Sequence, residues 1–331
     1  MTNGQSSEDL PFDADGLALH LLRGTQAAAL ACMPWVGRGD KNAADGAAVE
    51  AMREVLGNVP GRGEVLIGEG EKDDAPMLYR GEEIGTGHGP AFELAVDPLE
   101  GTNYAATGTE GSIAVVAASP KGSMCTTSGF YMDKVVVGPA AVGAVEIDAP
   151  VEDKLRAVAK ALGKPVEDIT AVVLDKPRHE ELIDAVRDLG ASVIAIPDGD
   201  VMGSLRVLVP GGGVDIALGV GGTPEGVLTA CAVKALGGDM QGRLAPQDDD
   251  EREKIKADGV DPNQVLGLDD LVSGEDCVFV ATAVTSTVFL PAPEKTPGGW
   301  KLGSLVVTPR HPSLFVTAVL SDEAAEGPTE S

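Results

Sequence analysis

Hydrophobic positions recur at two spacings along the first half of the chain, and these spacings separate helices from strands. Residues 14–31 place apolar side chains at intervals of three and four, which predicts a helix. The alanine-rich segment NAADGAAVEAMREVLG predicts a second helix, closed by Gly57. Short apolar runs predict strands at EVLIG, FELAVD, SIAVVAAS and MDKVVVG.

The second half of the chain alternates predicted helices and strands. VEDKLRAVAKALG predicts a helix ending at Gly163, and a strand (169–174), a helix (178–189) and a strand (192–196) follow. Residues 213–238 predict a strand, a glycine loop and a helix. The acidic stretch QDDDERE predicts a linker, and CVFVATAV and GSLVVTP predict late strands.

This mixture of strands and helices, without an internal repeat, predicts a layered α/β or α+β protein. We expect a boundary between two lobes near residues 140–150, with an N-terminal lobe over 10–145 and a C-terminal lobe over 146–320. Residues 1–9 are expected to be disordered, and residues 321–331 to form an acidic tail.

Composition narrows the class of protein further. Hydrophobic residues make up 43% of the 331 residues but aromatic residues only 3%, so small aliphatic side chains must fill the core. No apolar run approaches the length of a membrane span, and the N-terminus lacks the basic and apolar regions of a secretion signal. The four cysteines form no metal-type spacing, so we expect reduced thiols in a cytoplasmic protein.

The formal net charge of -27 makes nucleic acids and anionic membranes poor partners. One interpretation is a solvated acidic surface. The other is that some of the acids gather around metal ions.

The segment AVDPLEGTN places two carboxylates at the end of a predicted strand. Pro98 has no N–H for a sheet ladder, so the strand is expected to end at Asp97. Glu100 can fold back to the same point, and Gly101 permits close approach to a ligand. TNYAAT, starting at Thr102, predicts a single helical turn whose free N–H groups suit a phosphate.

Two carboxylates facing a phosphate require cations between them, and oxygen ligands with phosphate are typical of Mg²⁺. Taken alone, however, the pattern of an acid, a proline and a second acid is better explained as an ordinary turn with surface acids.

Further acids follow the same pattern of strand ends and helix starts. Asp40 and Asp45 lie in RGDKNAADGAAV, where a helix-start acid is the simpler explanation of Asp45. LIGEGEKDDAP carries Glu69 and Asp73 just after a strand. A solvated turn is a poorer explanation for Glu69, because Glu69, like Asp97, lies at the end of a predicted strand.

A glycine pair and a helix start lie close together in GGTPEGV. Thr223 is the expected N-cap, with Pro224 at the first helical position and Glu225 in the first turn. A cap needs no ligand, but the glycine pair before it permits close approach to one.

Basic candidates are few. Lys176 and Arg178 follow a strand in DKPRHE, and arginine suits bidentate phosphate binding. Surface ion pairs explain this segment equally well. IPDGDV ends another strand with Asp198, Gly199 and Asp200, which suit sugar hydroxyls or a simple turn.

Six segments, taken together and in order, resemble the class II (GlpX-type) fructose-1,6-bisphosphatases. They are GRGDKNAADGAAVEAMR, IGEGEKDDAPMLY, VDPLEGT, KPRH, PDGDV and GGTPEG, within residues 35–245. The resemblance implies the αβαβα sugar-phosphatase fold shared with inositol monophosphatases. It also implies hydrolysis of fructose 1,6-bisphosphate in gluconeogenesis, and possible hydrolysis of sedoheptulose 1,7-bisphosphate.

The resemblance also implies roles for individual residues. Two or more Mg²⁺ or Mn²⁺ ions would be bound, one by Asp45 and Glu69 and the second by Asp97, Glu100 and Glu225. Thr102, with Asp73 nearby, would position or activate the attacking water. The substrate would contact Glu100, Gly101, Thr102, Tyr131, Lys176, Pro177, Arg178, Asp198, Gly199, Asp200 and Gly222. The N-terminal lobe is thus expected to bind metal and the C-terminal lobe to bind substrate, in a homo-oligomer (dimer or tetramer).

Two other functions remain open from the residues alone. A phosphatase of the same fold acting on inositol monophosphate would have no second phosphate for Lys176 and Arg178. A non-catalytic acidic metal-binding or regulatory protein would need no hydroxyl at Thr102.

Overall fold

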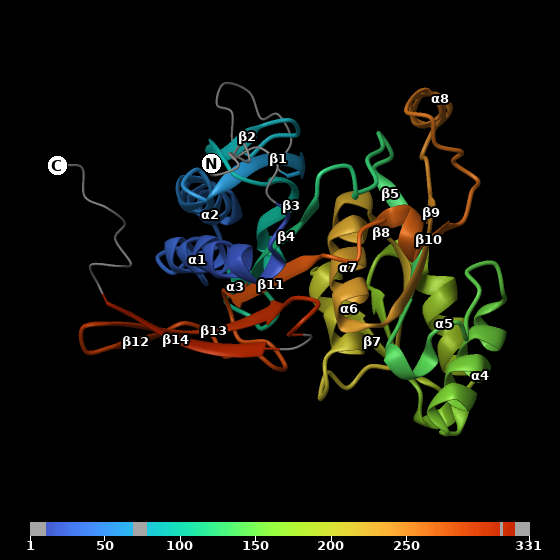
Figure 1. The fold of residues 1–331 in the computed structure, drawn as a ribbon. Helices are drawn as coiled ribbons and strands as arrows, with labels where there is room; N and C mark the ends of the chain where they lie inside the picture. The colour runs from blue at the N-terminus through green and yellow to red at the C-terminus, as the bar shows by residue number, and fades with distance from the viewer. Residues whose placement is uncertain (1–10, 69–77, 312–313, 322–331) are drawn as a thin grey trace. The chain divides into compact units, whose positions relative to one another are not determined.

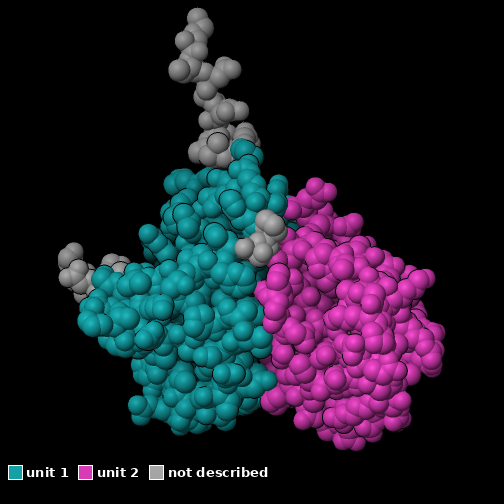
Figure 2. Space-filling model, turned by 90° about the horizontal axis from the view of Figure 1, so that it is seen from below, with its two compact units in different colours: residues 1–123, 276–331 teal, residues 124–275 magenta. Residues whose placement is uncertain are grey.

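The chain folds into two compact units, residues 1–123 with 276–331 and residues 124–275 (Figure 2). The structure is a computed structural model that describes residues 11–68, 78–311 and 314–321. The expected disorder of residues 1–9 lies outside these residues. So does the expected acidic tail, apart from Ser321 at the end of the last strand.

The first unit contains one mixed sheet with helices (Figure 1). In its described residues the strand order is β12-β13-β11-β4-β3-β1-β2, with β14 paired to β13. The elements are α1 (Ala14–Cys32), α2 (Lys41–Leu56), β1 (Gly61–Ile67), β2 (Glu83–His88), β3 (Ala91–Glu100), α3 (Thr102–Thr107), β4 (Ile113–Pro120), β11 (Val278–Ala283), β12 (Glu294–Thr296), β13 (Gly299–Val307) and β14 (Leu314–Ser321).

Helices α1 and α2 pack on one face of this sheet. Leu21 and Met52 of the helices are fully buried in the same apolar cluster as Leu94 of β3 and Val116 of β4. The central strands β3 and β4 are therefore held rigidly at the point where β3 delivers its acidic residues.

The second unit contains a sheet with strand order β10-β9-β5-β8-β6-β7. Its strands are β5 (Tyr131–Val137), β6 (Thr170–Leu174), β7 (Ser192–Ile196), β8 (Ile216–Gly222), β9 (Asp239–Leu244) and β10 (Leu266–Gly267). Its helices are α4 (Val151–Leu162), α5 (Glu180–Asp188), α6 (Asp200–Leu208), α7 (Thr223–Leu236), α8 (Asp249–Ala257) and α9 (Leu268–Leu271), with short 3₁₀ turns η1 (Pro139–Ala141), η2 (Val166–Asp168) and η3 (Pro177–His179).

Helices cover both faces of the second sheet. Val135 and Val173 share a buried cluster with α4 and α5. On the opposite face, Gly203 of α6 lies against Val172, and Gly226 of α7 lies against Met132. The predicted fold class, a layered mixture of helices and sheets, is confirmed. Among the described helices, none is both long and apolar enough to cross a bilayer.

Two features differ from the expected organisation. The acidic stretch expected to be a linker forms α8, because Asp248 caps it by accepting from the Glu251 N–H at 2.8 Å. The C-terminal strands, expected in the second lobe, belong to the first unit because β11 pairs with β4. Likewise β5 already belongs to the second unit, so the division falls at residue 123/124 rather than at 145/146.

Candidate active site

A β-bulge in β3 brings the first two acidic candidates together. Asp97 pairs with Val115 and Glu100 with Ile113, so three steps along β3 match two along β4. One residue is therefore extra, and Pro98, which has no N–H, lies in the bulge. The strand expected to end at Asp97 runs on to Glu100 for this reason.

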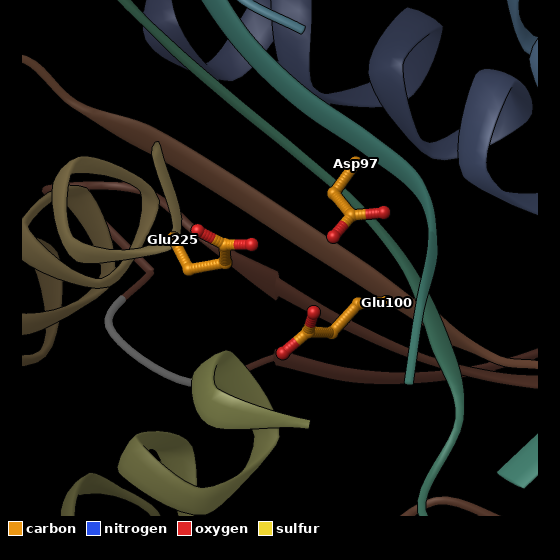
Figure 3. A group of neighbouring side chains, drawn as sticks. All are labelled: Asp97, Glu100 and Glu225. Carbon is orange, nitrogen blue, oxygen red and sulfur yellow. The ribbon is translucent and has the colours of Figure 1, made fainter. Parts of the chain in front are cut away.

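The bulge places the carboxylates of Asp97 and Glu100 on the same side of the strand, as Figure 3 shows. Their nearest oxygen atoms lie within 4.8 Å of each other, a separation that one cation can bridge. Asp97 accepts a hydrogen bond from the Leu99 N–H at 3.1 Å, which fixes its side chain. Glu100 is 5% exposed.

Helix α3 begins directly after these acids, as TNYAAT predicts. Gly101 precedes it with φ +76°, a left-handed conformation that glycine adopts readily. Thr102 is the first helical residue and is half-buried. The Ser112 hydroxyl donates to the Glu100 carbonyl at 3.0 Å and anchors the turn from below. Thr102 thus follows Asp97 and Glu100 in the sequence and starts α3.

Asp45, expected near a helix start, lies in the second turn of α2 and is half-buried. Asp40 is the N-cap and accepts from the Ala43 N–H at 3.0 Å, so Asp45 is not needed as a cap. Burial, reinforced by the nearby charge of Asp45, raises the pKa of the Cys32 thiol to about 12. Glu69 and Asp73, the other residues expected here, lie outside the described residues.

Glu225 lies in the first turn of α7, in the second unit (Figure 3). Burial raises the pKa of its carboxyl, against the opposing effect of its own backbone N–H and of the Lys134 ammonium. Its Oε2 is buried and has no hydrogen-bond partner among the described residues. A buried carboxylate oxygen that has no hydrogen-bond partner is suited to act as the ligand of a cation.

Gly222 rather than Thr223 is the N-cap of α7, which corrects the expected cap. A Cβ at Gly222 would lie 1.8 Å from the Glu225 Oε2, so this position must be glycine for the carboxylate to stay where it is. The two glycines thus allow another group to approach the backbone closely, as the sequence predicted. That group is a side chain of the same unit.

Lys134 on β5 is a functional candidate that the sequence did not reveal. It is 4% exposed, and its ammonium forms an ion pair with Asp200 at the start of α6. A Cβ at Gly221 would clash with this pair, lying 1.8 Å from the Asp200 Oδ2 and 3.0 Å from the Lys134 Nζ. The buried Lys134 therefore holds Asp200, a predicted ligand of the sugar, close to Gly221 of β8.

Replacing Lys134 with methionine should destabilise the protein by about 3 kcal/mol, because Asp200 would lose its partner at a site with little solvent. Chemical denaturation would measure the loss. Lys256→Met, at the exposed ion pair with Glu253, is the matched control and should cost less than about 0.5 kcal/mol. Equal losses in the two variants would contradict a special role for the buried pair.

Arg178 contacts the backbone of β8 and the first residue of β5. Its Nε and Nη2 donate to the Val220 carbonyl at 3.1 and 2.8 Å, and its guanidinium carbon lies 5.3 Å from the centre of the Tyr131 ring. Tyr131 is 36% exposed, so the pair faces solvent. The remaining N–H groups of a guanidinium oriented in this way can bind a phosphate.

The other predicted substrate residues lie on the turns around this pair. Lys176 donates from Nζ to the Pro197 carbonyl at 2.8 Å, and Pro177 starts η3. Gly199 is the N-cap of α6 with φ +81°, between Asp198 and Asp200. The second unit thus places Tyr131, Arg178, Asp200 and Glu225 near the start of β5 and the end of β8, and Lys134, in the middle of β5, pairs with Asp200.

Comparison with known proteins identifies the family of the chain. The family model described as bacterial fructose-1,6-bisphosphatase, glpX-encoded, matches residues 15–317. A fructose-1,6-bisphosphatase class 2 of Haemophilus influenzae is 47% identical over 283 residues, which cover 82% of this chain and 85% of the relative. Fructose-1,6-bisphosphatase 1 class 2 of Escherichia coli is 46% identical over 282 residues, covering 81% and 84%. The chain therefore belongs to the family of bacterial, glpX-encoded fructose-1,6-bisphosphatases.

Proposed function

We propose that the protein hydrolyses fructose 1,6-bisphosphate to fructose 6-phosphate and phosphate, the reaction of gluconeogenesis. The observation that carries this is the 46–47% identity, over more than four-fifths of the chain, to relatives named for that activity. Sedoheptulose 1,7-bisphosphate is the second candidate substrate, because it also presents a 1-phosphate and a distant phosphate.

We infer that divalent cations, Mg²⁺ or Mn²⁺, bind at the acidic residues. Asp97 and Glu100, whose oxygens lie within 4.8 Å of each other, and the incompletely satisfied Glu225 are the ligands of one ion. Asp45 and Glu69 are proposed for another. Oxygen donors of this kind fit hard divalent cations. When bound, the ions would polarise the phosphoryl group and neutralise the developing charge on the leaving oxygen.

Other residues of the chain act on the attacking water and on the sugar. Thr102, with Asp73, positions or activates the attacking water, and its hydroxyl can take a proton from the water only as it gives its own proton to a carboxylate such as Asp73. Asp198 and Asp200 bind sugar hydroxyls, with Asp200 oriented by Lys134. Attack by water leaves no phospho-enzyme, consistent with the burial of three of the four cysteine thiols.

Arg178 and Lys176 bind the distant phosphate and so select bisphosphates over monophosphates. The guanidinium is already oriented by the Val220 carbonyl and the Tyr131 ring, so little side-chain entropy is lost on binding. An inositol monophosphatase would have no use for this arrangement.

Arg178→Ala should raise the KM for fructose 1,6-bisphosphate by roughly 10- to 150-fold, the equivalent of one charge-assisted contact. The change in kcat should be smaller, and hydrolysis of inositol 1-phosphate should barely change. Arg187→Ala, at an exposed arginine on α5, is the matched control. Equal losses of bisphosphatase and monophosphatase activity in Arg178→Ala would remove Arg178 as a second-phosphate ligand.

A homo-oligomer, a dimer or tetramer, and a cytoplasmic location complete the proposal. The oligomer is supported by the family resemblance, and the location by the lack of a disulfide among the four cysteines, which suits a reducing compartment. Light scattering of the purified protein tests the first.

A further inference from the structure

The imidazole of His179 lies between β6 and β8 at the point where these two strands part. The strands pair at Ala171–Ile216 and Val172–Ala217, and β6 then continues to Leu174 without further pairing to β8. The Val220 N–H donates to the His179 Nε2 at 2.8 Å, and the His179 Nδ1 lies 2.8 Å from the Leu174 carbonyl oxygen. The side chain therefore bridges two backbones that no longer bond to each other.

These two contacts define the tautomer of the ring. Because the Val220 N–H can only donate, Nε2 must accept, so Nδ1 carries the proton and donates to the Leu174 carbonyl. Burial lowers the pKa of His179, with the Arg178 charge acting in the same direction and the Leu174 carbonyl, Asp133 and Asp200 opposing. Burial thus favours the neutral ring that the geometry requires.

The neighbouring strand leaves room for the ring at Gly219. This glycine has φ +112°, and a Cβ there would lie 2.8 Å from the His179 Nε2. His179 itself is 3% exposed. The fit of the imidazole against β8 thus depends on a position without a side chain.

Val220 links His179 to Arg178. Its N–H is bound by His179, and its carbonyl accepts both hydrogen bonds from Arg178. Both polar backbone groups of Val220 are thus held by two consecutive side chains, which replace the pairing that β6 no longer supplies. A shift of Val220 must shift the guanidinium with it.

We propose that His179, as a neutral Nδ1–H imidazole, is a positioning residue that holds Val220 and thereby orients the Arg178 guanidinium toward the distant phosphate of the substrate. This inference rests on the phosphate-binding role proposed above for Arg178.

Two substitutions separate the two hydrogen bonds. In His179→Gln the side-chain oxygen can reach the place of Nε2 and accept from Val220. In His179→Asn the amide can donate to Leu174 in place of Nδ1 but does not reach Val220. His179→Asn should raise the KM for fructose 1,6-bisphosphate by about 3- to 10-fold, the equivalent of one hydrogen bond. His179→Gln should stay near the wild-type KM, and kcat should change less than KM in both.

A double substitution tests whether His179 acts through Arg178. In an Arg178→Ala background, His179→Asn should raise KM no further, because the group that it orients is gone. If the two effects multiply, or if His179→Asn alone leaves KM unchanged, the positioning role is wrong. If Arg178→Ala by itself leaves KM unchanged, the phosphate-binding role of Arg178 fails first, and the positioning role with it.

The imidazole protons of the wild-type protein supply a direct test of the tautomer. Long-range ¹⁵N–¹H spectra of the imidazoles are practical because the chain has four histidines. The signal absent from His179→Gln, but present in the control His311→Gln, belongs to His179. It should show a proton on Nδ1 at neutral pH and titrate below the range of a free histidine. A proton on Nε2, or a charged ring at neutral pH, would overturn the proposal.

Discussion

Thr102→Ala should lower kcat by roughly 10²- to 10⁴-fold, the usual effect of removing a positioned proton-transfer group. The hydroxyl is the side-chain group that directly follows the Asp97–Glu100 bulge, and the positive φ of Gly101 turns the chain so that α3 starts there. Steady-state kinetics with fructose 1,6-bisphosphate would measure the loss. Thr102→Ser, which keeps the hydroxyl, should retain most of the activity.

Thr107→Ala is the matched control for this prediction. Thr107 lies in the same helix but is exposed, and its hydroxyl bonds to the Asn103 carbonyl at 2.8 Å. Both variants should bind metal and unfold at nearly the wild-type temperature. A Thr102→Ala enzyme with near-wild-type kcat would exclude Thr102 from the chemistry.

Removal of divalent cations should abolish activity, and Mg²⁺ or Mn²⁺ should restore it. Five carboxylates are proposed as ligands, and burial already disfavours the charged form of Glu225 in the absence of a cation. Saturating metal should also raise the melting temperature, since a ligand at 100 times its Kd stabilises the folded state by about 2.7 kcal/mol. Activity and thermal unfolding, each with and without excess chelator, are the measurements. Undiminished turnover in chelator would contradict the metal mechanism.

Glu225→Gln separates a metal ligand from a helix-start acid. Without metal the variant should be as stable as the wild type or more so, because a desolvated carboxylate is replaced by a neutral group. Its melting temperature should then respond less to added metal. Glu180→Gln, in the first turn of α5, is the matched control for the helix dipole. An unchanged metal titration with a lower melting temperature in Glu225→Gln would instead favour the helix-start interpretation.

Local patterns in the sequence predicted the acids of β3 but not the shape of the strand. Taken alone, the pattern of Asp97, Pro98 and Glu100 favoured an ordinary turn, and the resemblance of six segments to a known family implied a metal site there. The oxygens of the two acids do lie close together. The bulge that produces this approach depends on the pairing with β4, which lies further along the chain. Residue propensities predict that the strand ends before Pro98. They do not show that pairing with β4 extends the strand to Glu100.

Lys134 and His179 show a second kind of information that local patterns lack. The segment MDKVVVG predicts a strand but does not show that Lys134 is buried. Its burial is explained by Asp200, 66 residues away in the sequence. His179 stood inside a recognised motif, but its two bonds join the ends of two other strands. Lys134 depends on a partner distant in sequence, and so does His179 through Val220, although its other partner, Leu174, lies only five residues before it.

The same reason explains the C-terminal strands and α8. CVFVATAV predicted a strand correctly, but its pairing with β4 is a contact between segments far apart in the chain. The acidic stretch was predicted to be a linker because it contains many charged residues. Glu251, however, is 4% exposed and accepts from the Phe130 N–H at 2.7 Å, which ties α8 to the start of β5.

Phosphate release from three substrates by the Mg²⁺- or Mn²⁺-loaded protein tests the central claim most directly. The substrates are fructose 1,6-bisphosphate, sedoheptulose 1,7-bisphosphate and inositol 1-phosphate, compared by kcat/KM under the same conditions. The account predicts the highest value for fructose 1,6-bisphosphate, with fructose 6-phosphate as the product. Release of phosphate from inositol 1-phosphate with no activity on either bisphosphate would contradict it.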